Sequence, residues 1–158
     1  MLYGSETWPI RSEDLKRLEV FDHRCLRHIS RIQWTDRISN VEVRKRVLGE
    51  GSNSLCRTLR LHRLRWLGHV LRMPSHRIPS RTLFAEPSAN WRKARGGQRM
   101  TWQKDMKNVT KPLGQTGAIR LPGWGPRDSV NMWLCTLRDM AQNRTQWREC
   151  CRTLTESL

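Results

Sequence analysis

The sequence predicts an all-α protein: a small irregular helical bundle with a basic flexible loop and a Gly/Pro-rich linker. Apolar residues recur every three or four positions through much of the 158 residues, which is the period of a helix that buries one face. No stretch shows the convincing alternation of apolar and polar residues that marks a half-buried strand. Serine, glycine and proline stand at the ends of the periodic segments, as is typical of helix boundaries.

The first predicted helix covers about residues 13–32. Ser12 is suited to cap its start, and Glu13 and Asp14 place negative charge in its first turn, where the helix dipole favours it. We expect its apolar stripe to face a core. The stripe consists of Leu15, Leu18, Phe21, Cys25, Leu26, Ile29 and Ile32.

A second, short helix is predicted to begin at a capping box. Ser39 and Glu42 are spaced so that the Ser39 side chain can accept the backbone N–H of Glu42, and the Glu42 side chain can accept the backbone N–H of Ser39. Val43, Val47 and Leu48 are expected to point inward, and Gly49 and Gly51 to end the helix.

The third predicted helix, about residues 54–73, is the centre of the chain. Its apolar residues form two stripes, so we expect it to bury two faces, with arginines along the seams between them. Pro74 ends it. One stripe is Leu55, Leu59, Trp66, Val70 and Met73, and the other is Leu61, Leu64, Leu67 and Leu71.

Three regions are expected: a helical region at 1–73, a basic loop at 74–100, and C-terminal helices at 101–158 with a Gly/Pro-rich linker at 111–128. Within the loop, a single turn is expected around residues 82–86. The C-terminal helices are predicted at about 101–109, from a cap at Asp128 or Ser129, and from Asn143 or Thr145.

The formal charge of +16 is concentrated in the middle of the chain. Residues 51–100 carry 11 basic side chains and one acidic side chain, Glu86. Such a block attracts polyanions, and arginine's planar fork suits phosphate. The candidate nucleic-acid-binding residues are therefore Arg57, Arg60, Arg63, Arg65, Arg72, Arg92, Lys93, Arg95 and Arg99. The Gly96–Gly97 part of the loop is as well explained by a flexible linker as by phosphate contact.

Other chemistry finds little support in the sequence. The six aspartates include no adjacent pair of the kind that holds catalytic metal ions, and we expect them to be helix caps and solvent-side charges. Cys25 and His28 would need Cys56 and His62, or Cys150 and Cys151, to complete a zinc site, and the spacing is not that of a zinc finger. We expect no metal, no cofactor, no small-molecule substrate and free thiols.

Eight tryptophans are unusual for this length. Trp66, Trp102, Trp133 and Trp147 lie in phase with the helices and are expected to anchor the core, although aromatic rings beside arginines also stack on unpaired bases. The sequence has no run of apolar residues long enough for a membrane span and no secretory signal. We therefore expect an intracellular protein, nuclear or cytoplasmic, that binds no membrane.

Several stretches resemble the carboxy-terminal part of non-LTR (LINE-type) retrotransposon reverse transcriptases. They are LYGSETW at 2–8, FDHRCLRHISRIQWTDRISNVEVRKR at 21–46 and LRWLGHVLRMPSHRIP at 64–79. RGGQRMTWQKDMK at 95–107 and MAQNRTQWREC at 140–150 are similar to later segments of that region, whereas residues 111–128 depart from it.

The resemblance implies the thumb and the segment beyond it, which hold the template–primer duplex. The family's Tyr-x-Asp-Asp palm motif and its endonuclease are absent from the sequence. We therefore expect a fragment that binds RNA or DNA and is not itself an enzyme, although the family is one of RNA-directed DNA polymerases. The alternatives are a non-functional retroelement remnant and a zinc-stabilised interaction module.

Overall fold

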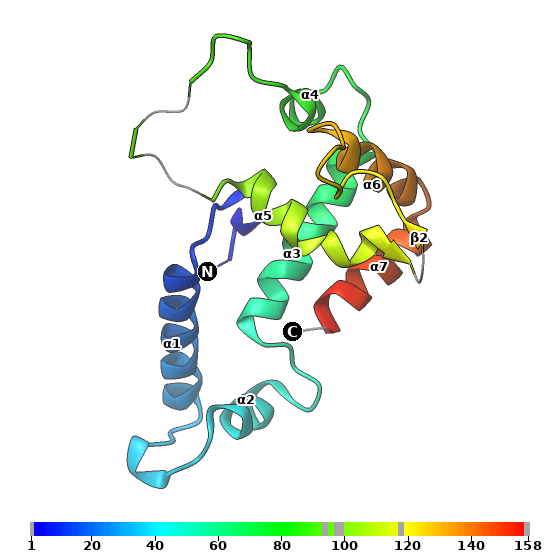
Figure 1. Ribbon diagram of the computed structural model, residues 1–158. Helices are drawn as coiled ribbons and strands as arrows, with labels where there is room; N and C mark the ends of the chain where they lie inside the picture. Colours follow the sequence, from blue (N-terminus) through cyan, green and yellow to red (C-terminus); the bar gives the residue numbers. More distant parts are fainter. Residues whose placement is uncertain (1, 93–94, 97–99, 117–118, 157–158) are drawn as a thin grey trace. The chain divides into compact units, whose positions relative to one another are not determined.

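The computed structural model describes residues 2–92, 95–96, 100–116 and 119–156. The described residues form seven α-helices, short 3-10 turns and one small hairpin, which confirms the predicted all-α class (Figure 1). The chain divides into two compact units: a larger unit, Met1–Pro9 with Leu61–Leu158, and a smaller unit, Ile10–Arg60. The division falls within one helix, so the units differ in extent from the regions 1–73, 74–100 and 101–158 expected from composition.

The smaller unit contains α1 (Ser12–Ile29), the 3-10 turn η2 (Trp34–Asp36), α2 (Asn40–Leu48) and the first residues of α3 (Leu55–Leu71). One half of the predicted capping box is found at α2, where the Ser39 hydroxyl accepts the Glu42 N–H at 3.2 Å, whereas the Glu42 carboxylate pairs with Arg46. Gly49, with a φ of 87°, ends that helix.

Two arginines connect α1 to the segments after it. Arg27 donates to Asn40 Oδ1 at 3.2 Å and to the Ile38 carbonyl. Arg44 forms an ion pair with Asp22 and donates to the Asn53 carbonyl at 3.1 Å. These cations therefore hold the smaller unit together.

Three expectations for α1 and α2 are wrong. Ser12 is the first helical residue, and Arg11 occupies the N-cap position without a side-chain bond. Of the apolar stripe on α1 only Leu26 is buried, while Phe21 and Ile29 are 50% and 66% exposed. Leu48 of α2 is also exposed. The helix that packs against α1 is α2, which has nine residues against the 18 of α1. Only Val43 of α2 is buried. This short helix therefore leaves part of the apolar stripe of α1 uncovered.

The larger unit begins with the 3-10 turn η1 (Ser5–Thr7) and includes most of α3. It continues with α4 (Ile78–Phe84), α5 (Trp102–Val109), α6 (Met132–Gln142) and α7 (Arg144–Glu156). Between α5 and α6 lie the turn η3 (Lys111–Gly114) and the antiparallel pair β1 (Gln115–Thr116) and β2 (Ile119–Arg120). The hairpin pairs Gln115 with Arg120.

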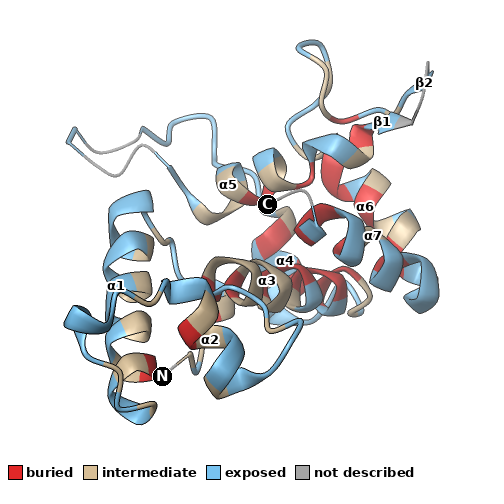
Figure 2. Cartoon of the chain, turned by 90° about the horizontal axis from the view of Figure 1, so that it is seen from below, coloured by how far each residue is buried: buried red, intermediate tan, exposed pale blue. Residues whose placement is uncertain are grey.

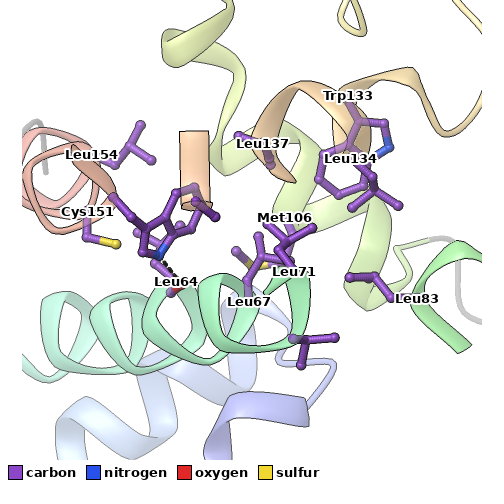
Figure 3. Close-up of a cluster of buried hydrophobic side chains, with 13 residues drawn as sticks. Leu64, Leu67, Leu71, Leu83, Met106, Trp133, Leu134, Leu137, Cys151 and Leu154 are labelled. Atoms are coloured by element: carbon purple, nitrogen blue, oxygen red, sulfur yellow. Dashed lines mark hydrogen bonds between the residues drawn. The ribbon is translucent and has the colours of Figure 1, made fainter. Parts of the chain in front are cut away.

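The core of the larger unit is formed by α3, α5, α6 and α7 together with Leu83 of α4, and buried residues concentrate on these helices in Figure 2. Both predicted stripes of α3 contribute to burial, and Leu64, Leu67 and Val70 have no exposed surface. Trp133 and Trp147 are 3% and 4% exposed, which confirms them as core anchors. Figure 3 shows the side chains converging from these helices: Leu64, Leu67, Leu71, Met106, Leu134, Leu137, Cys151 and Leu154.

The described residues of the Gly/Pro-rich segment, 111–116 and 119–128, include a packed turn. The Trp124 ring lies over Gly114, where a Cβ would come within 2.7 Å of Trp124 Cε3, and Trp124 Nε1 donates to the Lys107 carbonyl at 3.1 Å. Asp128 was expected as a possible helix cap, but its carboxylate accepts the N–H groups of Gly123 and Gly125 instead. Consequently α6 begins three residues later than Ser129, with Asn131 as its N-cap residue.

Candidate nucleic-acid interface

The predicted arginines occupy different environments. Arg65 is exposed on α3, and Arg92 and Arg95 are exposed in the loop before α5. Arg57 and Arg60 are half-buried on the part of α3 that belongs to the smaller unit. None of these five has a carboxylate partner among the described residues. Lys93 and Arg99 lie outside the described residues.

Arg63 is an interior cation. Its side chain is 9% exposed and its Nη1 lies 2.5 Å from Asp105 Oδ2 on α5. Its guanidinium carbon lies 5.9 Å from the centre of the Trp102 ring, which itself meets Trp66 edge to face at 5.4 Å. The ion pair joins α3 to α5. Because removing one partner of a buried ion pair is costly, Arg63 has a structural role and is not part of the proposed interface.

Arg72 has both a structural contact and a positive neighbour. Its Nη1 donates to the Ala141 carbonyl near the end of α6 at 3.1 Å. Partial burial lowers the pKa of Arg72, and the positive charge of Arg144 lowers it further. Arg72 and Arg144 therefore lie close enough to sense each other's charge.

Arg144 and Arg148 are exposed cations that the sequence interpretation did not single out. They stand one turn apart on α7, and neither has a carboxylate partner among the described residues. Glu149 and Glu156 of the same helix are both engaged by Arg152. The signal was in the sequence: both glutamates stand three or four residues from Arg152, which is the spacing of helical ion pairs.

Cys151 of α7 is a buried thiol in the core of the larger unit. Burial raises its pKa to about 11, the neighbouring Cys150 acts in the same direction, and Arg65 and Arg72 oppose the shift. A thiol that stays protonated at neutral pH is a poor nucleophile.

The described part of the chain contains no candidate metal centre. It holds no group of three or more His, Cys, Asp or Glu residues that could bind a metal ion, and all five cysteines are free. Asp105 and Asp128 are used in an ion pair and a turn. No helix within the described ranges is long and apolar enough to cross a membrane.

Comparison with known proteins returned no matching family model, no matching curated protein and no matching solved structure. The functional interpretation therefore depends on the arrangement of the cations described above and on the family resemblance of the sequence.

Proposed function

We propose that this chain binds the sugar–phosphate backbone of a nucleic acid, RNA or DNA, as the thumb-side fragment of a non-LTR retrotransposon reverse transcriptase. The observation that carries the proposal is the excess of ten positive charges within residues 51–100. A basic block of this size attracts polyanions by releasing their condensed counterions. The exposed Arg65, Arg92 and Arg95, none with a carboxylate partner in the described structure, support it.

The arrangement and the chemistry of the arginine side chains both favour contacts with the nucleic-acid backbone over recognition of the base sequence. Arginine side chains on a helix packed into a core offer fixed forks to phosphate oxygens. Phosphate contacts set the position of a protein on a duplex and carry no base information directly. We therefore expect little base specificity and, in the absence of a metal-binding aspartate pair in the sequence, no polymerase activity from this chain alone.

The proposal is tested by titrating the purified chain into a labelled RNA–DNA hybrid at 50 mM and 200 mM salt. With about four phosphate contacts, affinity falls on the order of a hundredfold between the two conditions. Arg65→Gln combined with Arg92→Gln and Arg95→Gln weakens binding, whereas Arg152→Gln, which removes a cation already paired with Glu149 and Glu156, leaves it nearly unchanged. Affinity that is independent of salt contradicts the proposal.

The same preparation distinguishes the binding fragment from a non-functional remnant. A functional fragment unfolds in a sharp cooperative transition and binds the hybrid. Broad unfolding without binding supports the remnant, because a chain under no selection for function has no reason to keep a single packed state.

A further inference from the structure

We infer that α7 supplies half of the phosphate-binding site: Arg72, the residue directly after α3, and Arg144 of α7 hold one backbone phosphate between them, and Arg65 of α3 and Arg148 of α7 supply further positive charge along the same two helices. We call these four residues the α3–α7 arginine cluster. The inference rests on the proposed nucleic-acid function and goes beyond it, because it assigns the binding site to two helices that are far apart in the sequence.

The two helices are fixed against each other at a close contact. Trp147 Nε1 donates to the Leu64 carbonyl at 3.1 Å, the bond drawn as a dashed line in Figure 3. The indole lies against Gly68, where a Cβ would come within 2.0 Å of Nε1. Residues one turn from this contact on either helix therefore have defined positions relative to each other.

A second contact sets Arg72 beside the start of α7. Arg72 donates a hydrogen bond to the Ala141 carbonyl at 3.1 Å, and Ala141 lies three positions before Arg144 in the sequence. Asn143, which lies between Ala141 and Arg144 in the sequence, caps α7, since its Oδ1 accepts the N–H groups of Thr145 and Gln146 at 3.0 and 3.1 Å. Those two backbone donors are thus already engaged, and the guanidinium groups are the donors that stay available to a ligand.

The cluster has an unbalanced charge. No described carboxylate pairs with Arg65, Arg72, Arg144 or Arg148, and the charge of Arg144 contributes to the lowered pKa of Arg72. Two like charges held close together disfavour the folded state unless an anion lies between them. The protein therefore gains from binding an anion at this place.

The anion that fits best is a phosphodiester of a nucleic-acid backbone. Two guanidinium forks offer planar pairs of N–H donors, which match the paired oxygens of a phosphate. Arg65 lies on α3 and Arg72 directly follows its last residue, seven positions on, or about 10 Å at the helical rise per residue, so a linear polyanion can engage both. A single free phosphate can occupy one end only.

The test compares Arg144→Gln, Arg144→Lys and the matched control Arg152→Gln on the same helix, using the labelled RNA–DNA hybrid. Arg144→Gln is expected to weaken binding about fivefold at 100 mM salt and to reduce the slope of log affinity against log salt by about 0.7 to 0.9. Arg144→Lys is expected to restore the slope, because it keeps the charge, and to restore the affinity only in part. Arg152→Gln is expected to match the wild type.

A shared phosphate also predicts coupling between the two arginines. The double variant Arg72→Gln with Arg144→Gln is expected to lose less affinity than the product of the two single losses, while circular dichroism confirms that each variant stays helical. Inorganic phosphate up to 10-fold above the protein concentration is expected not to displace the hybrid.

The outcomes separate the two proposals. If the wild type binds with the expected salt dependence but Arg144→Gln binds equally well, the two-helix site is overturned and the proposed function stands. If inorganic phosphate displaces the hybrid at that ratio, the cluster is a site for the free anion and the inference fails. If the wild type does not bind the hybrid, both proposals fail.

Discussion

Gly68 shows how one residue decides the packing of two helices. It lies in the middle of α3, where glycine is unfavourable for a helix by about 1 kcal/mol relative to alanine. Its lack of a side chain lets the Trp147 indole lie directly on the helix backbone. The sequence presents it as one more position in an apolar helix, since nothing near it indicates which distant residue needs the space.

Gly68→Ala is expected to destabilise the protein by about 1–3 kcal/mol, because the steric cost exceeds the gain in helix propensity. The added Cβ would lie 2.5 Å from Trp147 Cδ1 and 2.0 Å from Nε1. Chemical denaturation of the variant measures the loss. Combining it with Trp147→Phe is expected to cost less than the sum of the two single changes; additive costs would show that the indole is not the group that clashes.

Arg63 makes a similar point about charge. In the sequence it is one of several arginines on a helix, indistinguishable from Arg65 two positions later. Only the tertiary structure brings Asp105, 42 residues away, against it. Arg63 is thereby an interior ion pair, while Arg65 faces solvent.

At the scale of an element, the segment between α5 and α6 is built around Asp128. Its carboxylate accepts the N–H of Gly123 at 2.7 Å and of Gly125 at 2.6 Å. These two bonds lower the pKa of Asp128, and the bond from Gly123 has the largest effect. The positive charges of Arg120 and Lys107 lower the pKa by smaller amounts. A composition rich in glycine and proline predicts a linker, but the carboxylate, together with Trp124 over Gly114, makes it a folded turn.

Asp128→Ala is expected to lower the thermal midpoint at pH 7, with an effect that disappears in acid. Because the carboxylate pKa is lowered in the folded state, its stabilisation is complete above the ordinary value near 4 and is lost as pH falls below it. Thermal melts between pH 7 and pH 2 follow the convergence of variant and wild type. Asp139→Ala serves as the control, because Asp139 is an exposed aspartate on α6. If the difference in thermal midpoint between Asp128→Ala and the wild type stayed constant across this pH range, the turn would not depend on the charged carboxylate.

At the scale of the whole molecule, the two units differ in how much apolar surface they bury. The smaller unit has Leu26, Val43, Leu55 and Leu59 as its buried apolar residues, while Val20, Trp34 and Val41 are 69%, 86% and 80% exposed. The larger unit has a continuous buried cluster drawn from α3, α4, α5, α6 and α7. Local stability follows the density of such contacts.

Amide hydrogen exchange is therefore expected to be faster in α1 and α2 than in α6 and in the C-terminal half of α3. Val43→Ala is expected to speed exchange in the smaller unit, with little effect on α6, whereas Leu134→Ala, which removes a fully buried side chain, is expected to act on the larger unit. Mass spectrometry after timed deuteration measures both. Equal protection in all helices would show that the chain opens as a single cooperative unit.

Most helices could be predicted because their causes are local. The Ser39 cap, the Asn143 cap, the stop at Pro74 and the two stripes of α3 all depend on residues within a few positions of one another. The phase of Trp133 and Trp147 likewise predicted their burial. The missed features are the exposure of Phe21 and Ile29 on α1, the turn that Asp128 forms with Gly123 and Gly125, and the cations of α7 near Arg72. The last of these depends on residues that are far apart in the sequence.

The sequence by itself determined the helical class, the places where most helices begin and end, and a middle third with ten excess positive charges. These properties follow from periodicity, capping and composition, which are read along the chain. Only the tertiary structure decided which of the cations became structural and which stayed available. Arg63 met Asp105 and Arg44 met Asp22, which lie 42 and 22 residues away in the sequence. Arg65 and Arg144 met no carboxylate among the described residues, because a long-range ion pair depends on which side chains the packing brings within reach.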